Sequence, residues 1–143
     1  MTDAPTLTGQ DIGAAARATG ALLDRVLSPR GIDFQSSVVL NLLSTNGSTL
    51  DRDQLVARVV AELKVDATSV SATLAGLLHS GLVSEVDGSV SLTPAGAKMF
   101  NGIREGIGAI TRRIYGGLPA DDLAVAHRVL VAVTERANAE LAA

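Results

Sequence analysis

The sequence predicts a mainly α-helical fold with one small β-hairpin. Apolar residues recur at spacings of three and four along six segments, which is the period of an amphipathic helix. In residues 82–92 the period changes to two, and Asp87-Gly88 stands between the alternating runs, which is a strong hairpin signal. Aromatic residues make up 2% of the 143 residues, so the core must be built from Ala, Leu, Val and Ile. That composition suits closely packed helices.

Four helices are expected before the hairpin, and local signals bound each of them. Asp33 is positioned to cap the second helix, and Asp51 with Gln54 resembles a capping box at the start of the third. The fourth helix ends before Gly81, a residue that favours helix termination. We therefore expect helices over about residues 8–27, 33–45, 51–63 and 66–80.

Two further helices are expected after the hairpin. Thr93 can cap a helix that has Pro94 at its first position and runs to about Tyr115. After Gly116-Gly117, a sixth helix opens at Pro119 and carries a wide apolar face. The fifth helix contains three glycines, each unfavourable by ~1 kcal/mol relative to alanine. These positions, Gly102, Gly106 and Gly108, therefore indicate a close helix crossing or a bend.

Composition and motifs argue against several classes of protein. The chain has no cysteine, which excludes disulfide scaffolds and thiolate metal sites. Its two histidines, His79 and His127, have no accompanying carboxylate cluster, and no nucleotide-binding loop or nucleophile elbow is present. We therefore expect no metal, no cofactor and no enzymatic activity. No apolar run reaches the ~20 residues of a membrane helix, and Met1–Gln10 lacks a signal-peptide pattern, so we expect a cytoplasmic protein.

The order of the elements predicts a winged helix-turn-helix, in which short helices precede a β-hairpin wing. The most specific segments are residues 66–71, Leu77, Gly81-Leu82-Val83 and the run from Ser91 to Gly96. With the long flanking helices, the chain resembles the multiple antibiotic resistance regulator (MarR) family from about Leu7 to Leu141. In that family the first of these segments belongs to the recognition helix, and the others lead into and out of the wing.

The resemblance implies one domain over residues 1–143. It comprises a winged-helix lobe at about 33–93 and dimerisation helices at about 8–28 and 94–142. It also implies a homodimer that regulates transcription by placing two recognition helices in successive major grooves of a pseudo-palindromic operator, ~34 Å apart. A small aromatic effector that binds between the dimerisation helices and the DNA-binding lobe would change this spacing.

Carried onto this sequence, the resemblance gives two sets of candidate site residues. Among the DNA-binding candidates, those expected to face the major groove are Thr68, Ser69, Ser71, Ala72 and Thr73. Ser36 and Ser37 would contact the DNA backbone from the start of the second helix, and Ser89 would lie near the wing tip. The basic residues expected to flank the groove are Arg52, Arg58 and Lys64. The hydroxyl residues can equally serve as caps and helix surface. The effector candidates are Arg112, Arg113 and Tyr115, for which pairing across a dimer and solvated surface are the alternatives.

The chain departs from the family pattern in its charge. The wing turn carries Asp87-Gly88 and no arginine, and no Lys or Arg occurs from Val65 to Ala97. Residues 33–100 contain four basic and seven acidic residues, so the whole formal net charge of −3 lies in the predicted DNA-binding lobe. Because phosphate neutralisation supplies most DNA affinity, these features favour an alternative. In it, the winged-helix dimer has lost DNA binding and acts as a protein-interaction or small-ligand-binding module.

Overall fold

The computed structural model describes residues 4–143, and residues 1–3 of the predicted single domain lie outside the described residues. It is mainly helical with a small antiparallel sheet, as the sequence predicted. The described chain divides into two compact units, one up to Gly108 and one from Ala109 to Ala143. The boundary falls within the fifth α-helix, so this helix contributes to both units.

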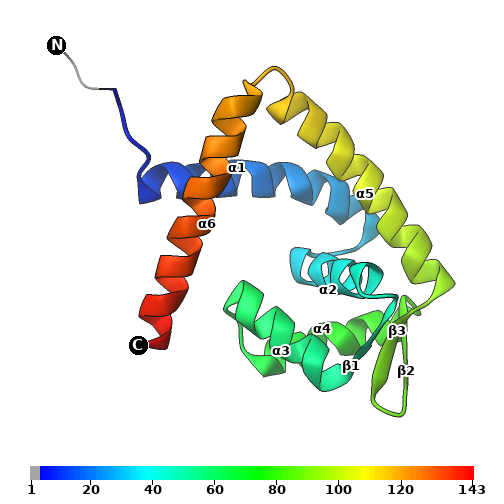
Figure 1. Ribbon diagram of the computed structural model, residues 1–143. Helices are drawn as coiled ribbons and strands as arrows, with labels where there is room; N and C mark the ends of the chain where they lie inside the picture. Colours follow the sequence, from blue (N-terminus) through cyan, green and yellow to red (C-terminus); the bar gives the residue numbers. More distant parts are fainter. Residues whose placement is uncertain (1–3) are drawn as a thin grey trace. The chain divides into compact units, whose positions relative to one another are not determined.

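The helices follow the predicted order (Figure 1). Their bounds are α1 Gly9–Leu27, η1 (a 3₁₀ turn) Ser28–Arg30, α2 Phe34–Thr45, α3 Arg52–Leu63, α4 Ala67–His79, α5 Pro94–Tyr115 and α6 Ala120–Ala142. Pro119 is the N-cap of α6, one position before the helix, instead of its first residue. The other predicted helix limits agree with the structure within about two residues.

Side-chain caps fix the helix starts that the sequence indicated. Asp33 accepts a hydrogen bond from the Ser36 backbone amide at 2.8 Å, and Asp66 accepts one from the Ser69 amide at 2.8 Å. Asp51 accepts from the Gln54 amide at 3.2 Å, which is one half of the predicted capping box. Each bond satisfies an amide that has no partner within the helix, so the polar cap residues set where α2, α3 and α4 begin.

The sheet has three strands in the order β1-β3-β2, one more strand than the sequence predicted. The hairpin joins β2 (Val83–Val86) to β3 (Ser89–Leu92), and its turn residues Asp87 and Gly88 have φ of 51° and 78°. These left-handed values are those of a type I′ turn, which matches the twist of paired strands. The additional strand β1 (Thr49–Asp51) pairs with β3 on its other side.

The core of the first unit is aliphatic and joins all of its helices to the sheet. Its fully buried side chains come from α1, α2, α3, α4, β3 and α5: Leu27, Val39, Leu40, Leu43, Leu55, Val59, Val70, Leu74, Val90 and Ile103. Leu74 and Val70 anchor α4 from one face. The opposite face of α4 is therefore left at the surface of this unit.

Two glycines of α5 sit where the helix approaches other backbone or side chains closely. A Cβ at Gly96 would lie 2.0 Å from the Leu82 carbonyl oxygen, and one at Gly106 would lie 2.7 Å from Cγ1 of Val26 in α1. The second contact confirms the close helix crossing predicted for this glycine-containing segment. Arg30 adds a polar link at the same crossing, donating to the carbonyl oxygens of Val26 at 2.7 Å and Gly102 at 3.3 Å.

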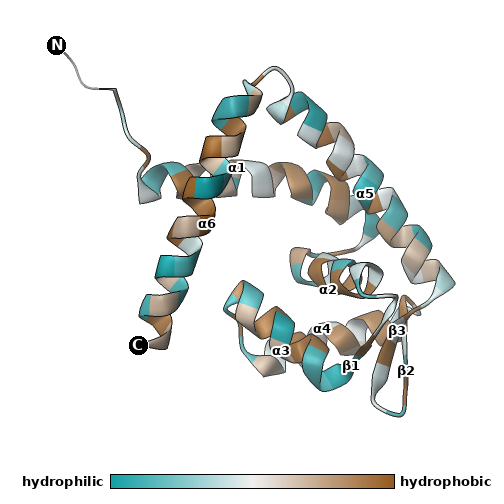
Figure 2. Ribbon diagram, viewed as in Figure 1, coloured by the Kyte–Doolittle hydropathy of each residue, from teal (hydrophilic) through white to brown (hydrophobic). Residues whose placement is uncertain are grey.

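The second unit consists of the end of α5, a short turn and α6. No residue of α6 is buried, although the helix carries a wide apolar face, visible as repeated brown segments in Figure 2. Most of its large aliphatic residues are 39–72% exposed, and only Leu123 is half-buried: the exposed ones are Val125, Val129, Leu130, Val131, Val133 and Leu141. A single copy of the chain therefore leaves this face of α6 uncovered.

Candidate functional site

The exposed face of α4 carries hydroxyl and methyl groups and no Lys or Arg side chain. Thr68, Ser69 and Ala72 are exposed, whereas Ser71 and Thr73 are half-buried. Gln35 of α2 holds this surface from one side, because its Nε2 donates to Ser69 Oγ at 3.1 Å and to Thr73 Oγ1 at 2.8 Å. The structure therefore gathers the five predicted major-groove residues on the first two turns of one helix.

The two serines predicted to contact DNA backbone from α2 differ in their placement. Ser36 is half-buried, and its backbone amide is bound by the Asp33 cap. Ser37 is only 8% exposed, and its hydroxyl donates to the Phe34 carbonyl oxygen at 2.6 Å. Ser37 faces the interior, and this placement does not favour the predicted contact with DNA. Consecutive helical residues point about 100° apart, which turns Ser37 inward while Ser36 stays nearer the surface.

The three basic residues expected to flank the groove are each engaged within the protein. Arg52 Nη1 lies 3.0 Å from Glu85 Oε2 of β2, and Arg58 Nη1 donates to Asn46 Oδ1 at 3.0 Å. Lys64 Nζ donates to the Ala61 carbonyl oxygen at 2.5 Å. Arg58 and Lys64 are exposed and keep other donor atoms available, whereas Arg52 is paired with a carboxylate. The positive charge available on this lobe is therefore smaller than the sequence alone indicates.

The wing is held against the start of α3. The Arg52 backbone amide donates to the Gly88 carbonyl oxygen at 2.8 Å, at the tip of the hairpin. Together with the Arg52–Glu85 ion pair, this bond fixes both the turn and β2 to α3. Ser89 lies directly after the turn, as predicted, and is half-buried opposite Asp51 of β1. The wing is thus a short sheet edge with an acidic tip at Asp87, not a long free arm.

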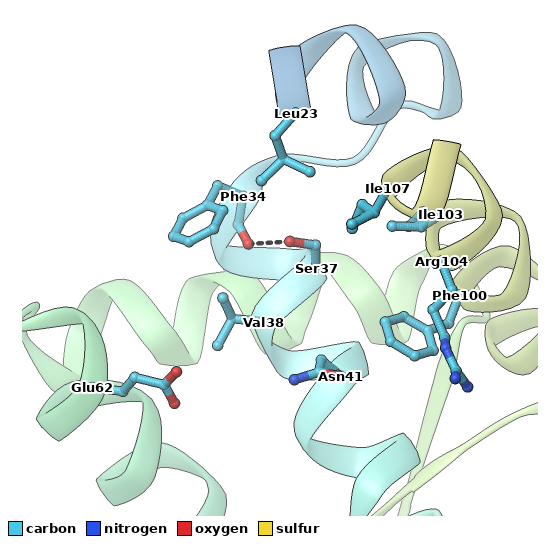
Figure 3. A pocket seen from close by; sticks show the side chains of 11 residues that line it. Leu23, Phe34, Ser37, Val38, Asn41, Glu62, Phe100, Ile103, Arg104 and Ile107 are labelled. Carbon is cyan, nitrogen blue, oxygen red and sulfur yellow. Dashed lines mark hydrogen bonds between the residues drawn. The ribbon is translucent and has the colours of Figure 1, made fainter. Parts of the chain in front are cut away.

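A second candidate site is a cavity of about 420 Å³ between α1, α2, α3 and α5 within the first unit. In Figure 3, Leu23 of α1 and Ile107 of α5 point toward α2, the Phe100 ring lies on the α5 side, and the Phe34 ring extends from α2 toward the opposite side. The full lining is Leu23, Phe34, Ser37, Val38, Asn41, Glu62, Phe100, Ile103, Arg104, Ile107 and Gly108. A small site of this kind, mostly apolar with a few polar groups, is typical of a pocket for a small organic molecule.

The polar groups of this cavity lie on different elements. Arg104 of α5 lies over the Phe100 ring, with its guanidinium carbon 6.0 Å from the ring centre. Asn41 belongs to α2, and Glu62 comes from α3, near the loop that leads to α4 (Figure 3). A ligand here would contact the helix before α4 and the long helix α5 at once.

The predicted effector residues are not among those that line this cavity. Arg112, Arg113 and Tyr115 are exposed and lie in the last turn of α5, beyond the end of the first unit. The sequence reasoning missed the lining residues because they come from four elements. One signal was available: the chain has only two phenylalanines, Phe34 and Phe100, and both line the cavity.

The described residues show neither a metal site nor a membrane-spanning helix. Across residues 4–143, no group of three or more His, Cys, Asp or Glu side chains is arranged to hold a metal ion. Within the same part of the chain, no helix is long and apolar enough to cross a membrane.

The chain is similar in structure to several MarR-family proteins, although no protein-family model and no curated protein sequence matches it. MarR from E. coli in its reduced form shares 22% identity over 91% of this chain and 95% of its own, with a TM-score of 0.70. NadR in complex with 4-hydroxyphenylacetate shares 22% identity over 90% and 95%, with a TM-score of 0.74. Sco5413, a MarR family transcriptional regulator from Streptomyces coelicolor, shares 24% identity over 89% and 92%, with a TM-score of 0.67. The chain therefore has the winged helix-turn-helix fold of the MarR family, as its motifs predicted.

Proposed function

We propose that the chain is a cytoplasmic, dimeric transcriptional regulator that binds a pseudo-palindromic DNA operator and responds to a small aromatic effector. The observation that carries this proposal is the exposed start of α4 in a MarR-type winged helix-turn-helix. In this fold the N-terminal residues of the recognition helix contact base edges in the major groove. Thr68, Ser69 and Ala72 are exposed at that position, and the buried face of α4 holds them on a rigid core.

The proposal includes a homodimer, because a palindromic operator requires two recognition helices. The uncovered apolar face of α6 supports it, since exposed aliphatic patches of this kind are typical of protein–protein interfaces. Val125, Val129 and Val133 follow one another at spacings of four on that face and are 39–49% exposed. Burial of these side chains against a second copy would supply the hydrophobic part of the dimer interface.

The proposed effector site is the cavity lined by Phe34 and Phe100. Its apolar walls suit an aromatic ring, and the Arg104 guanidinium suits an anionic substituent. The similar protein NadR has been crystallised with 4-hydroxyphenylacetate, an aromatic anion, so this compound is a suitable probe. We expect calorimetry to detect its binding and Arg104→Gln to weaken it about 10- to 150-fold, in line with the ~1.5–3 kcal/mol of a charged hydrogen bond. The matched control is Arg113→Gln, which should leave binding unchanged. If Arg113→Gln weakened binding and Arg104→Gln did not, the effector would bind near Arg112, Arg113 and Tyr115, as the sequence predicted, and not in this cavity.

The central experiment is a salt titration of binding to fluorescent duplex DNA of random sequence. If Arg52, Arg58 and Lys64 each neutralise one phosphate in both protomers, the logarithm of affinity falls with the logarithm of salt concentration with a slope of about −5. We expect a slope no steeper than this, since α4 and the wing add no cation. Absence of binding at the lowest salt would contradict the proposal.

The second candidate function is a winged-helix dimer that binds a protein or small ligand without DNA. The acidic wing tip and the engagement of Arg52 by Glu85 favour it. Asp87→Arg separates the two candidates, because the substitution places a cation where phosphate would lie in a DNA complex. DNA binding predicts higher affinity and a steeper salt dependence for Asp87→Arg, whereas the second candidate predicts no change in either.

A further inference from the structure

We propose that α4 recognises thymine, through the hydroxyl of Ser69 and the methyl groups of Thr68 and Ala72. This inference rests on the proposed function and specifies which base the DNA-binding surface reads. Thymine is the base that presents a hydrogen-bond acceptor, O4, next to a methyl group in the major groove. A surface that combines a hydroxyl donor with methyl groups is complementary to that edge.

The composition of α4 excludes the usual means of reading the other bases. Guanine is commonly read by Arg or Lys, adenine by Asn or Gln, and cytosine by Asp or Glu. From Ala67 to His79, α4 contains none of these residue types. The neighbouring amide, Gln35, already donates to Ser69 and Thr73. His79 lies at the far end of the helix, away from the N-terminal turn that enters the groove in this fold.

Gln35 also determines how the Ser69 hydroxyl is used. A serine hydroxyl accepts through its lone pairs and donates one proton. Ser69 Oγ accepts from Gln35 Nε2 at 3.1 Å, and within residues 4–143 no acceptor is found for its own proton. Because Ser69 is exposed, that proton is available to an acceptor in the groove, such as thymine O4. The contact between α2 and α4 therefore makes Ser69 a donor.

The methyl groups lie beside this donor on the same exposed surface. Thr68 precedes Ser69, and Ala72 follows Thr68 by one helical turn, so the two residues share a face of α4. Val70 and Leu74 are fully buried and fix the rotation of the helix, so Thr68 and Ala72 stay outward. Apolar contact with the thymine methyl is an established use of alanine and threonine side chains in DNA recognition.

The test compares thymine with uracil, which differs only by the methyl group. Duplexes enriched by the wild-type protein from a random pool are synthesised with dT or with dU, and both forms are titrated by fluorescence anisotropy. Loss of one buried methyl group lowers affinity about fourfold, so a dimer that contacts one thymine in each half-site binds the dU duplex about fifteenfold more weakly. Thr68→Ser, which removes the methyl and keeps the hydroxyl, should reduce the dT-to-dU ratio. Thr68→Val, which keeps methyl groups and removes the hydroxyl, is the matched control and should preserve it.

Each outcome separates this inference from the function on which it rests. Equal affinity for the dT and dU duplexes overturns thymine recognition and leaves the proposed DNA-binding function intact. A dT preference that is unchanged in both Thr68→Ser and Ala72→Gly overturns direct contact by these methyl groups. Failure of the wild-type protein to enrich any duplex overturns both the proposed function and thymine recognition by α4.

Discussion

Under the proposed function, the ion pair between the wing and α3 would compete with DNA for one of the few cations of this lobe, so its removal should strengthen DNA binding. Arg52 Nη1 and Glu85 Oε2 are 3.0 Å apart, and their side chains are 32% and 27% exposed. Partly exposed pairs of this kind contribute about 0.2–1 kcal/mol. If Arg52 must leave Glu85 to reach a phosphate, a dimer loses this energy twice. Glu85→Gln should then raise DNA affinity by about 2- to 30-fold.

The salt dependence of binding gives a second readout of the same substitution. Each phosphate contact changes the slope of the logarithm of affinity against the logarithm of salt concentration by about −0.9. Release of Arg52 in both protomers should therefore steepen the slope by up to about 1.8. The assay is a fluorescence titration on one fixed duplex at several salt concentrations, with wild type and Glu85→Gln measured side by side.

Two further variants make the result specific to the ion pair. Glu105→Gln removes the same charge from an exposed position on α5 and controls for net charge. Arg52→Gln removes the cation itself. In the Arg52→Gln protein, Glu85→Gln should therefore raise DNA affinity no more than Glu105→Gln does. Equal or weaker DNA binding by Glu85→Gln than by Glu105→Gln would refute the reasoning that the wing withholds Arg52 from DNA.

Three other predictions concern the proposed dimer and the fold. Val129→Asp places a charge on the apolar face of α6 and should weaken the dimer at least tenfold in analytical ultracentrifugation; an unchanged dimer would exclude this face from the interface. Gly96→Ala should lower the free energy of unfolding by about 3 kcal/mol in urea denaturation, because its Cβ would lie 2.0 Å from the Leu82 carbonyl oxygen. Its control, Gly76→Ala, has open space around the Cβ and should raise stability by about 0.5–1 kcal/mol. Gly88→Ala places a side chain at φ 78° in the wing turn and should lower the free energy of unfolding by about 1–2 kcal/mol in the same assay. An unchanged free energy of unfolding would refute the requirement for glycine at this position.

Most of the fold could be predicted because its signals are local. The caps Asp33 and Asp66 and the Asp87-Gly88 turn act within a few residues of their own position, so the sequence displays them directly. Strand β1 was missed for the opposite reason. Thr49–Asp51 is too short to show an alternating pattern, and it is a strand because β3 lies beside it.

The candidate site was less predictable, because side-chain orientation and pairing depend on tertiary contacts. Ser37 belongs to a polar pair at the start of α2, and only the packing of that helix shows that its hydroxyl turns toward the Phe34 carbonyl oxygen. Likewise, Arg52 looks available in the sequence, whereas its partner Glu85 lies 33 residues further along the chain. The cavity follows the same rule, since its lining residues come from four helices that only the tertiary structure brings together.

The first turns of α2 connect the two candidate sites. Phe34 and Val38 line the cavity, whereas Gln35, between them in the sequence, donates to Ser69 and Thr73 on α4. A shift of α2 would therefore change both the cavity wall and the hydrogen bonds that orient the hydroxyls of Ser69 and Thr73. A ligand alters such an equilibrium only if it binds one arrangement of α2 more tightly than the other. Under the proposed function, an effector in this cavity would thus act on base recognition by α4 as well as on the spacing of the two recognition helices.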